Sequence, residues 1–249
     1  MRNDHLDVGR ARAGLLDAIR PEVPFDGWSE TAFRAAVAAE GMDPALARVI
    51  CPRGAIDLAC DYHRAADRAA EAAIRAEDWP GMSYREKVAA SVRLRLELVD
   101  PELVRRAASA FALPHNAATG AKLMWESADT IWRALGDSST DGNWYTKRAM
   151  LSGVLSATVL FWMGDESEGH AESWAFLDNR IAEVMQIERI KGRLYPTPEA
   201  DQLFAEVSAV YNSVQRVNQV AEDLLDHRSG ALRIACSHNL SQSLLPRAI

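Results

Sequence analysis

Six histidines and 35 acidic residues are the side chains of this 249-residue sequence best suited to acid–base or metal chemistry. A diiron site in a helical bundle needs Glu-x-x-His, because residues three apart project from one helix face toward the metals. None of the histidines, at 5, 63, 115, 170, 227 and 238, has Glu three positions before it. Phosphate-loop, nucleophile-elbow and dinucleotide-binding glycine patterns are also absent. The sequence therefore predicts no catalytic residue, no metal site and no cofactor.

Two of the histidines lie in helical surroundings. His63 follows Tyr62 within a helix, and His115 follows Pro114 at a helix start. We interpret both as surface or capping residues and assign neither a role in proton transfer. His115 and Asn116 most simply serve the N-terminus of the next helix, where Asn is a favoured cap.

The composition indicates a globular, mainly helical protein that is not a general nucleic-acid binder. Hydrophobic residues make up 48% and charged residues 25%, and the formal net charge is −7. A general nucleic-acid binder needs a basic surface to neutralise phosphates. Cys51, Cys60 and Cys236 lack C-x-x-C spacing, which favours reduced, buried thiols.

No segment is predicted to cross a membrane or to direct secretion. The longest uncharged run, 149–164, has 16 residues, whereas a spanning helix needs about 20. The N-terminus contains acidic residues and has no apolar core of signal-peptide length. The protein is therefore expected to be soluble or peripheral.

Helical periodicity continues to about residue 190. Hydrophobic residues recur at helical spacing between short Pro, Gly and Asp interruptions. The segment 93–99, RLRLELV, alternates like a strand, but its flanks favour a helix. We therefore predict an all-α fold, with helices over 5–20, 29–40, 43–50, 53–77, 83–99, 101–112, 116–135, 141–163 and 171–190.

The helix predicted over 141–163 is apolar almost all round, so it must be enclosed by other helices or by lipid. Apolar stripes on the helices over 116–135 and 171–190 are expected to pack around it. One interpretation is an ordinary core helix. The other is a bundle with room for a greasy ligand, because the helix carries the small residues Ser152, Gly153, Ser156 and Ala157.

Residues 28–50 contain a helix, a Gly turn and a second helix, as in a helix-turn-helix. Across 26–53, three arginines stand against four acidic residues, so the local charge is 3 minus 4, or −1. Phosphate binding requires the opposite sign. We interpret this segment as a degenerate helix-turn-helix without DNA-binding function.

Three stretches carry a resemblance to a known family: LPHN at 113–116, GDSSTDGNWYTKRAML at 136–151 and SWAFLDNRI at 173–181. They resemble the lipid-binding accessory proteins of ubiquinone (coenzyme Q) biosynthesis, over about residues 10–190. The resemblance implies a TetR-like all-helical fold in which residues 113–190 bind an isoprenoid quinone or other long-chain lipid. It also implies a non-enzymatic protein that presents this lipid to a demethoxyubiquinone hydroxylase. The implied location is the cytoplasm, peripheral on the inner face of the cytoplasmic membrane.

The lipid site is expected among mutually facing apolar stripes. Cavity lining and core packing have the same pattern in a sequence, so the stripes suit either role. The predicted lipid-binding residues are Met124, Ile131, Met150, Leu151, Val154, Leu155, Trp162, Leu177 and Ile181.

The adjacent aromatics Trp144 and Tyr145 point about 100° apart on a helix, so they cannot enter one pocket together. They either brace the turn before the helix or anchor a protein interface, a role that aromatics favour. The resemblance favours the docking patch, with Lys147 at its rim and Asp141 also suited to cap the helix. The predicted partner-binding residues are Asp141, Asn143, Trp144, Tyr145 and Arg148.

The sequence changes character near Lys191, where GRLYPTPEADQLF leads into apolar residues at heptad spacing. With SGALRIACS and LLPRAI, residues 188–249 resemble the end of the wing, the linker helix and the first effector-domain strand of LysR-type transcription regulators. We therefore divide the chain into an accessory domain, 1–190, and a LysR-like linker helix with a truncated effector-domain start, 191–249. A long helix and a short terminal strand are expected in this tail, without regulatory activity.

Two other functions remain open at this point. One is a ligand-sensing TetR-like transcriptional regulator, which the acidic segment 26–53 argues against. The other is an inert fusion in which the heptads of the tail make the chain a homodimer.

Overall fold

The structure, a computed structural model, describes residues 7–139 and 142–191. The described residues lie in the first of the two units into which the chain divides, Met1–Arg193. Everything described is helical, turn or irregular, without a strand. The predicted tail, 191–249, lies outside the described residues except for Lys191, the last residue of its helix. The all-α prediction is confirmed for the described part.

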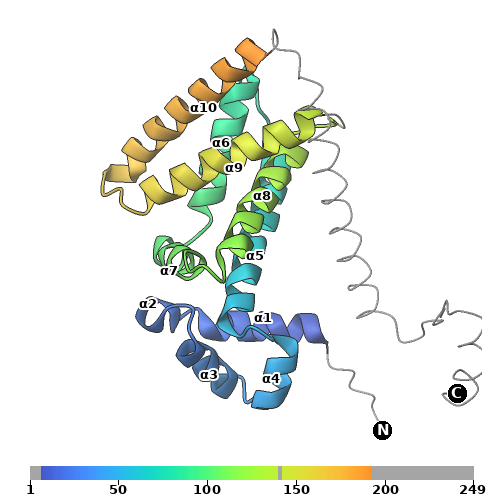
Figure 1. The fold of residues 1–249 in the computed structure, drawn as a ribbon, viewed down its shortest axis with the longest axis vertical. Coiled ribbons are helices and arrows are strands. Elements are labelled where there is room, and N and C mark those ends of the chain that lie inside the picture. The colour runs from blue at the N-terminus through green and yellow to red at the C-terminus, as the bar shows by residue number, and fades with distance from the viewer. Residues whose placement is uncertain (1–6, 140–141, 192–249) are drawn as a thin grey trace, which may run out of the picture. The chain divides into compact units, whose positions relative to one another are not determined.

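Four short helices and the start of a fifth enclose the first hydrophobic cluster (Figure 1). They are α1 (Val8–Ile19), α2 (Val23–Asp26), α3 (Glu30–Ala39), α4 (Pro44–Ile50) and the long α5 (Ala55–Ala76). Fully buried side chains at its centre include Leu15, Ile19, Leu58 and Ala32. We refer to this group as the N-terminal cluster.

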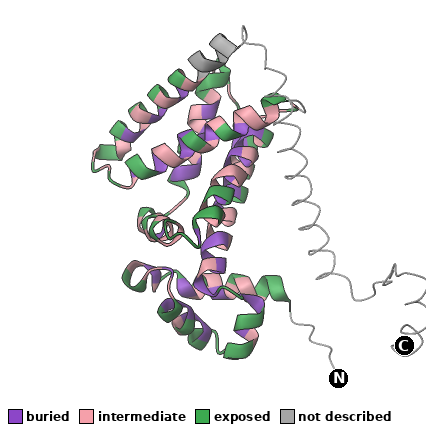
Figure 2. Cartoon of the chain, in the orientation of Figure 1, coloured by how far each residue is buried: buried purple, intermediate pink, exposed green. Residues whose placement is uncertain are grey.

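The remaining helices surround a second cluster, here called the C-terminal cluster. They are α6 (Tyr84–Glu97), α7 (Pro101–Phe111), α8 (Ala117–Ala134), α9 (Gly142–Trp162) and α10 (Ala171–Lys191), with a 3₁₀ turn, η1 (Glu168–His170), before α10. The helix α9 packs between α8 and α10, and α8 packs along α5. Figure 2 shows the resulting buried stripes on the facing sides of these helices.

Local sequence signals set several of the helix starts. Asp43 and Asp100 each accept hydrogen bonds from the first backbone amides of α4 and α7, and each is followed by Pro at the first helical position. Ser83 and Glu86 form a reciprocal capping box at the start of α6. These caps satisfy amides that would otherwise lack partners, so they define where the chain enters each helix.

All nine predicted helices are present, and RLRLELV is helical within α6 apart from its last two residues. The sequence did not predict α2, a single turn that begins two residues after Pro21. Asn116 occupies the expected capping position of α8, but its side chain donates to the carbonyl of Ala110 at 3.1 Å instead of capping the helix. Cys51 and Cys60 are buried free thiols, and burial raises the pKa of Cys51 to about 11.

Candidate functional site

A cavity of about 290 Å³ lies among α5, α7, α8 and α9, and α6 contributes Arg95 to its lining. Its wall is mostly apolar, with Val104 and Phe111 from α7, Met124 from α8 and Val159 and Leu160 from α9. Ligand sites in proteins are concave and mainly apolar, with a few polar groups that orient the ligand. This cavity has that composition.

Small residues create the space. Ala107 and Ala108 on α7 and Gly120 and Ala121 on α8 all line the cavity. A β-carbon at Gly120 would come within 2.9 Å of the β-carbon of Phe111, so the glycine allows the end of α7 to approach α8. Close-packed interiors leave few voids larger than a water molecule. A void of this size is therefore a specific feature of the fold.

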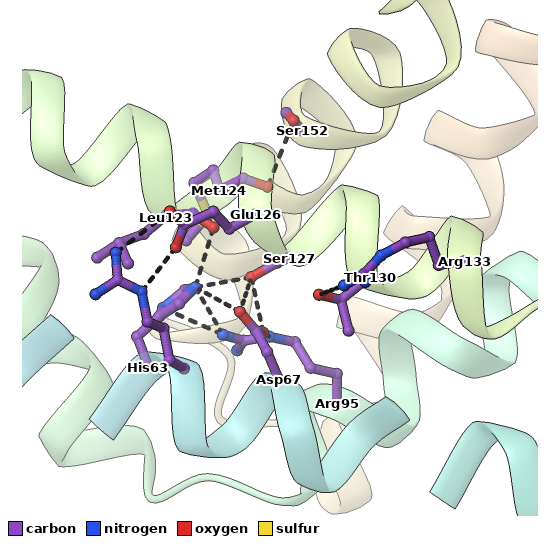
Figure 3. A network of polar contacts seen from close by, with 11 residues as sticks. His63, Asp67, Arg95, Leu123, Met124, Glu126, Ser127, Thr130, Arg133 and Ser152 are labelled. Carbon is purple, nitrogen blue, oxygen red and sulfur yellow. Dashed lines mark hydrogen bonds and ion pairs between the residues drawn. The ribbon is translucent and has the colours of Figure 1, made fainter. Parts of the chain in front are cut away.

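Two of the polar residues in the mostly apolar wall, His63 and Arg95, also belong to a buried network (Figure 3). The guanidinium of Arg95 donates from Nε to Asp67 at 2.9 Å, and the hydroxyl of Ser127 donates to the same carboxylate at 2.8 Å. His63 Nε2 lies 2.7 Å from the Ser127 hydroxyl and 3.2 Å from the carbonyl oxygen of Leu123. We refer to His63, Asp67, Arg95 and Ser127 as the polar network.

The partners of His63 indicate a neutral imidazole. Because the Ser127 hydrogen goes to Asp67, Nε2–H of His63 donates toward Ser127 and Leu123. The other ring nitrogen, Nδ1, then accepts from Arg95 Nη2 at 3.1 Å. Burial, reinforced by the charge of Arg95, holds the pKa of His63 well below its ordinary value. The expected surface or capping role of His63 is therefore wrong, because α8 covers the imidazole.

The nine predicted lipid-binding residues occupy three kinds of position. Met124 lines the cavity. Met150, Leu151, Val154 and Ile181 surround a separate gap of about 30 Å³, which suits about one water molecule. The other four are core residues of the C-terminal cluster, packed without a cavity of their own: Ile131, Leu155, Trp162 and Leu177.

Two of the predicted partner-binding residues, Trp144 and Tyr145, belong to a cluster of three aromatic side chains on α8 and α9. Trp144 and Tyr145 are half-buried and lie edge to face, with ring centroids 4.6 Å apart. Both also approach Trp125 of α8, at centroid distances of 6.0 and 6.3 Å. Asn143 is exposed beside them, and Asp141 lies outside the described residues. We call Trp125, Trp144 and Tyr145 the aromatic cluster.

Arg148, which we expected to face a partner, is buried beneath this cluster. Its side chain is 1% exposed and pairs with Asp129 at 2.6 Å and Asp137 at 3.1 Å. Its guanidinium also lies 4.0 Å from the ring centroid of Trp144, a cation–π geometry. Direct contact with a partner does not fit this burial, so we reassign Arg148 to positioning Trp144.

Asp137 forms ion pairs with two cationic side chains, Lys147 and Arg148, near the start of α9. Burial alone would raise its pKa, but hydrogen bonds from Lys147, Ser139 and Arg148 outweigh that effect and hold the pKa at about 2. The ammonium of Lys147 lies 2.8 Å from this carboxylate and 5.5 Å from the ring centroid of Trp132. Lys147 therefore pairs with the turn before α9, whereas we expected it at the rim of the docking patch.

The cavity and the aromatic cluster share the helix pair α8 and α9, and this pair is where similarity to known proteins concentrates. Residues 117–188 match the COQ9 family. The match begins at the start of α8 and ends within α10. It confirms the expected resemblance to ubiquinone biosynthesis proteins over this COQ9-like segment.

Individual relatives agree with the family match. The mitochondrial ubiquinone biosynthesis proteins COQ9 of Bos taurus and Homo sapiens are each 38% identical over 112 residues, which cover 35% of each relative. These matches span 44% and 45% of this chain. COQ9 of Drosophila melanogaster is 29% identical over 187 residues, 73% of this chain and 57% of that protein. The chain thus spans about a third of the length of the first two relatives.

The fold also has a solved counterpart. A TetR transcriptional regulator from Nitrosomonas europaea superposes with a TM-score of 0.55, covering 71% of this chain and 98% of the regulator, at 14% sequence identity. The likeness confirms the expected TetR-like all-helical fold. Within residues 7–139 and 142–191, no helix is long and apolar enough to cross a membrane. The same residues contain no cluster of three or more His, Cys, Asp or Glu side chains suited to a metal ion.

The cavity residues that the sequence analysis missed come mainly from α7 and the start of α8. Ala107, Ala108, Gly120 and Ala121 line the cavity through their small size, which apolar periodicity does not register. Among the small residues singled out on α9, Ser156 lines the cavity, whereas Gly153 is exposed. A run of small residues on α7 and α8 was the available signal, because small side chains on facing helices leave space between them.

Proposed function

We propose that this protein has a non-enzymatic role in ubiquinone biosynthesis, in which it binds an isoprenoid quinone intermediate and presents it to a hydroxylase. The observation that carries the proposal is an apolar cavity of about 290 Å³ next to the COQ9-like segment, whose helices α8 and α9 form part of its wall. The names of the curated relatives place them in ubiquinone biosynthesis. A lipid intermediate of that pathway is mainly apolar, which suits the wall.

Part of the cavity lining on α9 is exposed and apolar. Leu160 lines the cavity although its side chain is 66% exposed. Its neighbour Phe161 stacks on Phe176 of α10 with ring centroids 4.6 Å apart, and Phe161 is itself 38% exposed. An exposed apolar rim beside an opening suits transfer of a lipid from a membrane surface. We propose peripheral attachment to a membrane through this rim; the curated relatives are mitochondrial by name.

The aromatic cluster supplies the proposed docking surface for the hydroxylase. Tyr and Trp are enriched among the residues that dominate binding energy in protein interfaces. Trp144 is held against Trp125 and over Arg148, so its ring is positioned before a partner arrives. A preordered side chain loses less entropy on binding than a mobile one.

Lipid extraction tests the binding part of the proposal. The full-length protein is purified, its organic extract is analysed by mass spectrometry, and an unrelated helical protein prepared in parallel serves as the control. We expect isoprenoid quinone or a related prenylated lipid at close to one molecule per chain. A folded protein whose extract matches the control would argue against lipid carriage.

Substitution in the aromatic cluster tests the docking part. Trp144→Ala is expected to abolish co-purification with the hydroxylase, because it removes the ring at the centre of the surface, while leaving helicity unchanged. Phe25→Ala is the matched control, since Phe25 is an aromatic of α2 that is 84% exposed outside this surface. Equal co-purification of the Trp144 variant and the control would refute docking at Trp144.

A further inference from the structure

The cavity holds one buried cation with unused donor capacity. Arg95 is 3% exposed, lines the cavity, and uses Nε for Asp67 and Nη2 for His63. Its Nη1 group makes no hydrogen bond to any residue in the described ranges 7–139 and 142–191. This group is accessible to solvent, because the buried polar atoms that lack a partner in the same ranges do not include it. Its N–H groups are therefore available to an oxygen acceptor that enters the cavity.

The charge balance around Arg95 indicates what kind of acceptor this is. The positive charge of Arg95 is already neutralised by Asp67, 2.9 Å away, and the neighbouring His63 is neutral. An added carboxylate or phosphate would leave an uncompensated negative charge in a buried site, which is costly. A neutral carbonyl, ether or hydroxyl oxygen accepts the same hydrogen bond without that cost.

The volume limits which part of a ligand enters. An apolar cavity of about 150 Å³ holds a benzene ring. The volume here, about 290 Å³, accommodates one substituted ring and the beginning of a chain. A long polyisoprenoid tail exceeds it, so most of the tail lies outside, and the exposed Leu160 offers an apolar exit.

From these three observations we propose that the polar network is a head-group anchor: the cavity takes the neutral oxygenated ring of a prenylated quinone or phenol, with a ring oxygen on Arg95 Nη1. His63, Asp67 and Ser127 hold the guanidinium in place and are positioning residues. The ring is inserted first and the tail lies outside, toward the rim on α9. This inference rests on the proposed function, since it specifies how the carried lipid is oriented.

The test compares two probes with the same geranyl tail on a six-membered ring, one with two ring carbonyl oxygens and one with none. Geranyl-benzoquinone and geranyl-benzene are titrated into the full-length protein by isothermal titration calorimetry. A hydrogen bond from a charged donor contributes about 1.5–3 kcal/mol, so the quinone should bind about 10- to 100-fold more tightly than the hydrocarbon. A geranylated benzoate at neutral pH should bind more weakly than the quinone.

A double variant assigns the preference to Arg95. Arg95→Met combined with Asp67→Asn removes both charges together, so neither is left buried and unpaired. We expect the preference for the quinone to disappear while the affinity for geranyl-benzene is retained. The control is Arg64→Met with Glu126→Gln, which removes another ion pair of α5, here with α8, that lies outside the cavity lining. This control should keep the wild-type preference.

The outcomes distinguish a failure of the head-group anchor from a failure of the proposed lipid-binding function. Equal affinity of the wild-type protein for quinone and hydrocarbon overturns the anchor and leaves lipid carriage standing, and this comparison does not depend on any variant folding. An unchanged preference in the double variant also overturns it, as does tighter binding of the benzoate than of the quinone. Failure of both the quinone and the hydrocarbon to bind overturns the proposed function itself.

Discussion

At the scale of single residues, two arginines pair with the same carboxylate, and one arginine is buried whereas the other is exposed. Asp129 receives Arg148, which is 1% exposed, and Arg133, whose side chain is 53% exposed. We expect Arg148→Met to lower the free energy of unfolding by about 1–3 kcal/mol, because it removes two buried charged hydrogen bonds, although Lys147 still pairs with Asp137 and Arg133 with Asp129. Arg133→Met should cost less than about 1 kcal/mol, because its ion pair is exposed. Urea unfolding of both variants measures the difference, and similar losses would contradict the assigned burial.

The neutral state of His63 predicts a pH dependence of stability. Its pKa is lower in the folded than in the unfolded chain, where it is near 6.5, so the unfolded chain binds a proton first as the pH falls. Stability from this residue is therefore complete above pH 6.5 and decreases below it, by up to about 1.4 kcal/mol per pH unit. The substitution His63→Gln should reduce the decrease in unfolding free energy below pH 6.5.

The exposed His115 provides the control for that measurement. His115→Gln should leave the slope of stability against pH at its wild-type value, measured by urea unfolding between about pH 6.5 and 5. Equal slopes for the His63 variant and the wild type would show that the imidazole becomes protonated within the folded protein.

The polar network could not be predicted at this scale. Asp67 and Ser127 are 60 positions apart, and Arg95 belongs to a segment whose alternation resembles a strand. Helical periodicity predicts which face of a helix is buried, but not which polar residues on two faces meet. Arg148 was more accessible to prediction, because it is a charge next to the long apolar stretch of α9, where burial requires a carboxylate partner.

At the scale of elements, two helical glycines should respond in opposite directions to the same substitution. Gly153 on α9 is exposed and an added β-carbon meets no atom within 4 Å, so Gly153→Ala should stabilise the protein by about 0.5–1 kcal/mol. Gly120→Ala places a β-carbon 2.9 Å from that of Phe111. This overpacking costs about 1–3 kcal/mol and should outweigh the helix gain. Thermal unfolding of both variants checks the signs, and equal stabilisation would show that α7 and α8 are not closely packed at this point.

The positions of the helices were predictable, and the space between them was not. The pairs Asp43-Pro44 and Asp100-Pro101 marked the starts of α4 and α7 in the sequence, and both act as expected. The volume of the cavity depends on how far α7 lies from α9, a distance that no local pattern encodes. This is why Met124 alone of the nine predicted lipid-binding residues lines the larger cavity.

At the scale of the whole molecule, the TetR-like fold raises the question of DNA binding. Glu30 of α3 accepts ion pairs from Arg34 at 3.2 Å and Arg48 at 2.6 Å, and Arg53 pairs with Asp57 at 2.8 Å. The arginines of the helix-turn-helix-like segment are thus engaged by local carboxylates. We expect no retardation of duplex DNA in a gel shift at low salt. Retardation that weakens steeply with added salt would favour the alternative function of a transcriptional regulator.

The helix α5 belongs to both hydrophobic clusters, with Leu58 and Ala59 in the first and Ala70 and Ile74 in the second. A second connection is α7, whose Leu103 lies in the first cluster and whose Val104 packs against the second. Substitutions in the core of one cluster can thus leave the other core unchanged, provided that α5 and α7 are retained. The COQ9-like segment, 117–188, lies wholly on one side of that division. The segment that resembles COQ9 therefore belongs to the C-terminal cluster, whereas α1 to α4 belong to the N-terminal cluster.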